Sequence, residues 1–177
     1  RMLKHFGANI EITSKGSKNI IQLSSLNHLQ AQDYMVVGDI SSAAFLIVGA
    51  LISNSPGLEI TNVGMNPSRT GVLDALQKMG ANIEVKNQRM ESGEPCADLE
   101  VKESVLKGIE LSGDIIPNII DEIPVISIAA AFAEGETVIR DAAELRVKES
   151  DRLKAVSDGF NSLGVVHKNF DDGMCIS

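Results

Sequence analysis

Residues 75–85 read ALQKMGANIEV, and they join the end of a helical pattern to a strand pattern through one glycine. The same arrangement stands at residues 2–12 as MLKHFGANIEI, and a weaker copy stands at residues 160–166 as FNSLGVV. The glycines of the three copies are Gly7, Gly80 and Gly164. A glycine in this place can take the left-handed conformation that ends a helix. The spacing of the copies predicts a repeated structural unit of roughly 75 to 85 residues.

Two apolar segments repeat in phase with these glycines. Residues 41–53 (SSAAFLIVGALIS) are expected to form a helix that Asp39 or Ser41 caps. Residues 124–133 (PVISIAAAFA) are expected to form a second helix, in which Pro124 is acceptable only in the first turn. Helices that are apolar on nearly all sides are usually buried. The pattern therefore predicts an α/β domain in which repeated βαβαββ units enclose their helices.

Each unit is expected to run strand, helix, strand, helix, strand, strand. In the first unit, residues 33–92, these elements are 34–37, 41–53, 58–63, 68–79, 82–85 and 89–92. In the second unit, residues 93–177, they are 97–101, 118–133, 137–141, 149–163, 165–168 and 174–177. Residues 1–32 are expected to be the tail of a preceding unit, with strands at 10–12 and 19–23 and a polar crossing segment at 24–32. We therefore expect a piece of a longer protein, in which residues 28–177 form one domain truncated at its C-terminal end.

The composition narrows the class of protein. The apolar share of 44% is that of a globular chain, but aromatic residues make up only 3% and tryptophan is absent, so the core must consist of aliphatic side chains. The net charge of −8 argues against a nucleic-acid-binding surface, which needs a basic stripe. The apolar runs at residues 43–52 and 123–133 are too short to span a bilayer. We expect a cytoplasmic protein with no membrane partner.

Cysteine and histidine offer no metal site. Cys96 and Cys175 stand far apart without metal-type spacing, which indicates free thiols in a reducing compartment. The histidines are scattered and form no ligand pair: His5, His28 and His167. Phosphate-binding loops, serine elbows and zinc spacings are missing from the sequence, and we expect neither a metal nor another cofactor.

Residues 146–152 (RVKESDR) hold three cations and two carboxylates. On a helix, Lys148 and Arg152 would share a face, and Glu149 would pair with Arg152 three residues later. Such a face suits a small ligand with phosphate or carboxylate groups, because arginine binds them through two parallel hydrogen bonds and lysine adds a mobile charge. The alternative is a solvated helix start with internal salt bridges.

Asp121 and Glu122 stand inside an otherwise apolar run, directly before the second apolar helix. They either favour the helix N-terminus through its dipole or provide a general base held against an apolar wall. Residues 66–71 (NPSRTG) are explained as the start of a helix, and Arg69 as an additional anion contact is the weaker interpretation.

Five motifs in order carry a resemblance to a known family. They are residues 38–45 (GDISSAAF), 66–71 (NPSRTG), 93–99 (GEPCADL), 120–124 (IDEIP) and 145–152 (LRVKESDR). Together they resemble the family of 3-phosphoshikimate 1-carboxyvinyltransferase, also called EPSP synthase. The resemblance covers essentially the whole chain. It implies the enolpyruvyl transferase-like fold, in which two domains, each of three units, form inverse α/β barrels with buried parallel helices.

The resemblance also implies a reaction, the transfer of the enolpyruvyl group of phosphoenolpyruvate to the 5-hydroxyl of shikimate 3-phosphate without a metal. By motif, Asp121 resembles the acid/base that contacts shikimate 3-phosphate, and Lys148 resembles the lysine that contacts the same substrate. Glu149 resembles the carboxylate at the reacting carbon, and Arg152 an arginine that holds phosphoenolpyruvate. Glu144 stands where some relatives place an asparagine near the shikimate.

Several family motifs are missing, among them the early Lys-Ser motif, the Ser-Ala-Gln segment and the late Asp-His-Arg motif. We therefore expect a catalytically incompetent fragment whose partner is the missing half of its own parent chain. Two alternatives stay open at this point. One is the related carboxyvinyltransferase that acts on UDP-N-acetylglucosamine, and the other is a non-catalytic module built from the same repeats.

Overall fold

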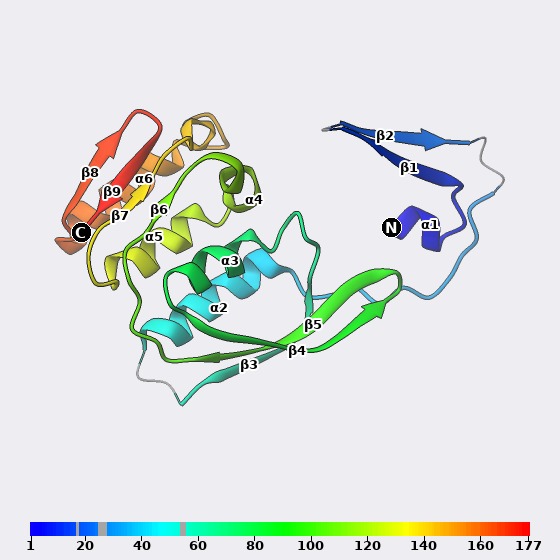
Figure 1. The fold of residues 1–177 in the computed structure, drawn as a ribbon, viewed down its shortest axis with the longest axis horizontal. Coiled ribbons are helices and arrows are strands. Elements are labelled where there is room, and N and C mark those ends of the chain that lie inside the picture. The colour runs from blue at the N-terminus through cyan, green and yellow to red at the C-terminus, as the bar shows by residue number, and fades with distance from the viewer. Residues whose placement is uncertain (17, 25–27, 54–55) are drawn as a thin grey trace.

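The computed structural model describes residues 1–16, 18–24, 28–53 and 56–177 (Figure 1). The N-terminal part consists of α1 (Met2–His5) and an antiparallel hairpin of β1 (Ile10–Lys15) and β2 (Lys18–Leu23). Figure 1 shows this hairpin set apart from the rest of the chain. The two strands predicted at residues 10–12 and 19–23 are confirmed.

A first sheet follows, with the order β3-β5-β4 and antiparallel pairing throughout. Its strands are β3 (Leu58–Gly64), β4 (Asn82–Glu91) and β5 (Glu94–Lys102), and its helices are α2 (Ile40–Ile52) and α3 (Gly71–Lys78). The strand predicted at residues 34–37 is wrong. In the part of the chain that the structure describes, parallel pairing with β3 is confined to an isolated bridge between Gly38 and Val63. The amide of Met35 donates instead to the Ser92 hydroxyl at 2.8 Å.

The second sheet repeats that arrangement with the order β6-β7-β9-β8. Its strands are β6 (Glu110–Leu111), β7 (Thr137–Ile139), β8 (His167–Phe170) and β9 (Gly173–Ile176). Its helical elements are η1 (Gly113–Ile115), α4 (Ile116–Ile119), α5 (Ile123–Ala131), η2 (Ala143–Arg146) and α6 (Arg152–Leu163). In the second sheet β6 runs parallel to β7, and in the first Gly38 pairs in parallel with β3 in the same way. The last two strands of each sheet, β4 and β5 in the first and β8 and β9 in the second, form an antiparallel hairpin. The predicted repetition is therefore present in the strand order.

The repetition corrects the place of one strand. The strand predicted at residues 97–101 does not open the second unit, because β5 pairs with β3 and β4 of the first sheet. The opening strand of the second sheet is β6, whose two residues are too few for an alternating pattern. The other limits of the predicted units stay predictions.

Helix and strand limits differ from the pattern at further places. The strands predicted at residues 82–85 and 89–92 are one strand, β4, with a register shift between Lys86 and Arg89. The helix predicted at 68–79 begins at Gly71. The helix predicted at 118–133 is interrupted at residues 120–122, since Pro124 has no amide to donate to the carbonyl four residues earlier.

The glycines of the three sequence copies have the predicted conformation. Their φ angles are +89° at Gly7, +94° at Gly80 and +74° at Gly164, and Gly164 is the C-cap of α6. Because side chains other than glycine rarely take this conformation, the glycines fix the place where each helix turns into the next strand.

The helices α2, α3 and α5 lie between the two sheets (Figure 1). Ile47 of α2 and Ile126 of α5 are completely buried in a core of aliphatic side chains. The expectation of burial on all sides holds only in part, because Phe45 of α2 and Phe132, the C-cap of α5, are 65% and 63% exposed. Within the described residues, no helix is long and apolar enough to cross a membrane.

Asp98 lies on the central strand β5 and forms hydrogen bonds to both neighbouring strands, β3 and β4, each of which has a register shift. It accepts the backbone amide of Asn62 in β3 at 2.8 Å and the side-chain amide of Asn87 in β4 at 2.9 Å. Both asparagines have positive φ, +58° and +49°, at the register shifts of their strands. Arg89 completes the network, with Nη1 3.1 Å from Asp98 and Nη2 donating to Asn62.

The amide of Asn62, the side chain of Asn87 and then Arg89 lower the pKa of Asp98 from its ordinary value. A carboxylate with a lowered folded-state pKa stabilises the fold above its unfolded pKa, about 3.9, and loses that contribution as the pH falls through the folded-state pKa. We predict that Asp98→Asn lowers the free energy of unfolding at pH 7, and that the difference from the unsubstituted chain shrinks below about pH 4. Urea unfolding followed by circular dichroism at pH 7 and pH 3 measures it. A difference that grows on acidification would contradict the network.

Candidate active site

Asp121 is the point at which the predicted site residues meet. It lies in the turn between α4 and α5, and its side chain is 34% exposed. Lys148 Nζ lies 3.3 Å and Arg152 Nη1 3.2 Å from the same oxygen, Oδ1. The structure therefore brings together two sequence segments that the motifs had only placed in order.

The conformation expected for residues 146–152 is wrong. Residues 147–150 form bends between η2 and α6, and α6 begins at Arg152 because the Asp151 side chain caps it by accepting the amide of Lys154 at 2.9 Å. Lys148 and Arg152 thus do not share a helix face. They meet at Asp121 because the bends turn Lys148 back towards the turn that carries this carboxylate. Arg152 still pairs with Glu149, at 2.7 Å between Nη2 and Oε2.

Arg146, counted among the cations of this stretch, holds the bends in place. Its Nε donates to the carbonyl of Asp171 and its Nη2 to that of Phe170, both at 2.7 Å. Nη1 lies 3.1 Å from Asp151, the residue that caps α6. Arg146 therefore connects the start of α6 to the turn between β8 and β9. Its guanidinium makes all three of these contacts within the protein.

Two exposed carboxylates accompany the cations. Glu144, 64% exposed, lies 3.3 Å from Lys148 Nζ, and hydrogen bonds from Lys148 to Glu144 and then to Asp121 raise the pKa of the lysine. The pKa of Glu149 is lowered by a hydrogen bond from its own backbone amide and by the Arg152 guanidinium. The same pairing with Glu149 raises the pKa of Arg152. Both cations and Glu149 are therefore charged at neutral pH.

Arg69 is a third cation of the site, and the sequence had favoured a simple helix start for it. Its Nη1 lies 3.6 Å from Asp121 Oδ2, the oxygen that Lys148 and Arg152 leave free. Its Nη2 donates to Ser41 Oγ at 2.7 Å. No spacing could have revealed these contacts, because they join segments that lie far apart in the sequence.

The site gathers helix N-termini. Ser41 lies in the first turn of α2, Arg69 shortly before α3, and Asp121 directly before the N-cap of α5, while Arg152 opens α6. The contacts between these residues place the four helix starts around one point. Backbone amides at helix N-termini carry partial positive charge, so they add to the three cations in favouring an anion.

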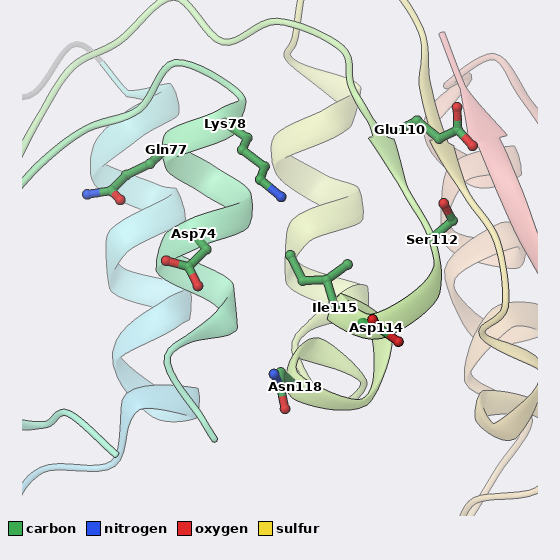
Figure 2. A pocket seen from close by; sticks show the side chains of 8 residues that line it. All are labelled: Asp74, Gln77, Lys78, Glu110, Ser112, Asp114, Ile115 and Asn118. Carbon is green, nitrogen blue, oxygen red and sulfur yellow. The ribbon is translucent and has the colours of Figure 1, made fainter. Parts of the chain in front are cut away.

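A broad hollow that the structure describes lies away from this site. Figure 2 shows it between α3 and the segment that runs from β6 to α4, and it contains none of the predicted site residues. Its lining carries three carboxylates against one lysine, namely Asp74, Glu110 and Asp114 with Lys78. That charge does not suit an anionic ligand. Within the described residues, no group of three or more His, Cys, Asp or Glu side chains is arranged to hold a metal ion.

The contacts of Lys148 give a direct test of the site's electrostatics. We predict that Glu144→Gln and Asp121→Asn each lower the pKa of Lys148 towards its ordinary value, because each removes a carboxylate that stabilises the charged amine. A pH titration of ¹³C-labelled lysine side chains by NMR measures the change. Lys154 is the matched control, since its raised pKa derives from Asp158 and should not move. An unchanged Lys148 pKa in both variants would contradict the geometry.

The whole chain, residues 1–177, matches the family model described as EPSP synthase (3-phosphoshikimate 1-carboxyvinyltransferase). A curated 3-phosphoshikimate 1-carboxyvinyltransferase from Geobacter sulfurreducens is 51% identical over 176 residues, which are 99% of this chain and 40% of the relative. One from Synechocystis sp. is 50% identical over 174 residues, which are 98% of this chain and 38% of the relative. The chain thus spans about 40% of the length of the curated relatives it matches.

Solved structures agree with the sequence match. EPSP synthase from Acinetobacter baumannii superposes with a TM-score of 0.92 at 44% identity, over 99% of this chain and 39% of that one. The enolpyruvyl transferase NikO from Streptomyces tendae superposes with a TM-score of 0.70 at 17% identity, over 99% of this chain and 38% of that one, which shows a shared fold. The expected enolpyruvyl transferase-like α/β fold is confirmed. On the match over residues 1–177 and the relatives near 50% identity, the chain belongs to the EPSP synthase family.

Proposed function

We propose that a full-length protein carrying this chain transfers the enolpyruvyl group of phosphoenolpyruvate to the 5-hydroxyl of shikimate 3-phosphate and releases phosphate. The observation that supports the proposal most is the meeting of Lys148, Arg152 and Arg69 on Asp121 at the starts of four helices. Both proposed substrates are anions, and fixed cations and helix N-termini stabilise negative charge at the reacting groups.

The proposed roles are those that the family motifs imply for these residues. Asp121 takes the proton from the attacking 5-hydroxyl, and Lys148 binds shikimate 3-phosphate beside it. Glu149 delivers a proton to the methylene carbon of phosphoenolpyruvate, Arg152 holds the anionic groups of that substrate, and Glu144 lies at the edge of the shikimate site. The hydroxyl oxygen bonds to the second carbon of phosphoenolpyruvate, and loss of phosphate and of a proton from the methyl group restores the double bond.

The ion pair between Arg152 and Glu149 suggests how the binding of phosphoenolpyruvate prepares Glu149 to act as the acid. In the free site, a hydrogen bond from its own backbone amide and the Arg152 guanidinium both lower the pKa of Glu149. When phosphoenolpyruvate binds Arg152, Glu149 loses this partner and its pKa rises towards its ordinary value, which makes the carboxyl a better proton donor. We propose this exchange of partners as the step that prepares Glu149.

The chain spans about 40% of its relatives, so the proposal concerns a site that this chain provides in part. We propose that residues 1–177 alone do not turn over, that the remainder of a full-length chain is their partner, and that the protein acts in the cytoplasm. Nucleic acid and membranes are not among the proposed partners.

The test uses a full-length chimera in which residues 1–177 replace the matching segment of the Geobacter sulfurreducens relative. We expect it to release phosphate from phosphoenolpyruvate only in the presence of shikimate 3-phosphate. Asp121→Asn should lower kcat by about 10²–10⁴-fold, the usual contribution of a general base. Lys148→Met and Arg152→Gln should each lower kcat/KM by about 10²-fold or more, because each leaves a bound anionic group without its cation.

Lys154→Met is the control, since Lys154 is an exposed lysine of α6 whose partner is Asp158. It should leave turnover unchanged. An active chimera in which Asp121, Lys148 and Arg152 can all be replaced without loss would favour a non-catalytic role for this segment. Turnover or thermal protection with UDP-N-acetylglucosamine in place of shikimate 3-phosphate would assign the other carboxyvinyl transfer.

A further inference from the structure

Glu122 is a buried carboxylate whose place in the site the proposed reaction does not explain. It follows Asp121 directly and is only 3% exposed, at the N-cap position of α5. Its side chain accepts no amide of that helix, so capping does not account for it. Instead it accepts the hydroxyl of Ser41 and lies 3.8 Å from Arg69 Nη2. A carboxylate removed from water needs such partners, and here both come from the first repeat unit.

Ser41 is available as a bridge because another side chain caps its helix. Asp39 accepts the amides of Ser41 and Ser42 at 3.3 and 3.0 Å, which leaves the hydroxyl of Ser41 free for other contacts. That oxygen donates to Glu122 and accepts from Arg69 Nη2 at 2.7 Å. Ser41 therefore holds the buried carboxylate on one side and the guanidinium on the other.

The other end of the same guanidinium faces Asp121. Arg69 Nη1 lies 3.6 Å from Oδ2, whereas Lys148 and Arg152 both approach Oδ1. Lys148 and Arg152 come from one segment, residues 148–152, and both contact Oδ1. Arg69 comes from the segment before α3 and contacts Oδ2, so cations from two different segments engage the two oxygens of Asp121. This arrangement restricts rotation of the carboxylate.

We propose that Ser41, Arg69 and Glu122 form a positioning unit that sets the orientation of the Asp121 carboxylate for proton transfer. Glu122 and Ser41 hold the guanidinium of Arg69, and Arg69 holds Oδ2 of Asp121 while leaving Oδ1 to Lys148 and Arg152. Arg69 acts through Asp121 and is a positioning residue. The proposal rests on the proposed function for its effect on turnover, but the orientation of Asp121 is a property of the protein alone.

The experiment compares Arg69→Gln, Arg69→Lys and Arg89→Gln in the full-length chimera. Arg89 is the matched control, because it is another half-exposed arginine whose Nη1 pairs with a carboxylate, Asp98, at 3.1 Å away from the site. Arg69→Gln should lower kcat by about 10–100-fold, with KM for both substrates changed less than about threefold, since a small misplacement of a catalytic group costs rate rather than binding. Arg69→Lys should recover part of kcat because lysine keeps the positive charge. The recovery should be incomplete because lysine lacks the forked guanidinium that contacts both Ser41 and Asp121.

Arg89→Gln should lower the melting temperature and leave kcat unchanged. An increase in KM alone on Arg69→Gln would overturn the proposal in favour of direct substrate binding, and a loss of melting temperature with unchanged kcat would reduce Arg69 to a structural role. Crystal structures of the same variants test the positioning of Asp121 independently of the proposed enzymatic activity. We expect the Asp121 carboxylate to take a single conformer in the unsubstituted chimera and in Arg89→Gln. In Arg69→Gln we expect it to take a different conformer or several conformers.

If the unsubstituted chimera does not turn over the two proposed substrates, the proposed function fails and the crystal structures still decide the positioning role. An Asp121 side chain that keeps its conformer in Arg69→Gln would overturn the positioning unit whatever the activity.

Discussion

The charge of one carboxylate, Asp121, makes the arrangement of this site possible. Arg69, Lys148 and Arg152 all approach it within 4 Å, and four helices begin around it. Each cation also has a carboxylate of its own, but Asp121 is the one that all three share, and its negative charge offsets the repulsion among them and the helix dipoles. The carboxylate is partly exposed, so solvent weakens each pair, but several charges acting on one group are worth more than isolated surface pairs.

The local backbone serves this meeting of charges. Pro124 has no amide to continue the helical hydrogen bonds from α4 into α5, so a turn separates the two helices. In this turn Asp121 is partly exposed and Glu122 is buried. Asp151 starts α6 at Arg152, which leaves residues 147–150 free to bend and to bring Lys148 back towards Asp121. Arg146 fixes that bend on the turn between β8 and β9. Capping and proline chemistry, both local, thus set the geometry of contacts between distant segments.

How far the sequence predicts this protein depends on the range of each interaction. The three glycine caps and the apolar helices follow from local chemistry, and they are confirmed. The two-residue strand β6 and the pairing of β5 with the first sheet depend on partners far along the chain, and the pattern missed both. Among the site residues, Asp121, Lys148, Glu149 and Arg152 were named and do meet, although the helix face expected for them does not exist. Arg69 was set aside because its contacts with Ser41 and Asp121 arise only when segments far apart in the sequence pack together.

A double-mutant cycle in the free energy of unfolding between Asp121→Asn and Arg152→Gln tests most directly whether Asp121 holds the cations of the site. If it does, the two substitutions are not additive, and the coupling favours the native pair by about 0.5 kcal/mol or more, within the range of partly exposed and networked ion pairs. A coupling of zero within error would mean that the cations keep their places without Asp121, and it would contradict the central role given to this carboxylate.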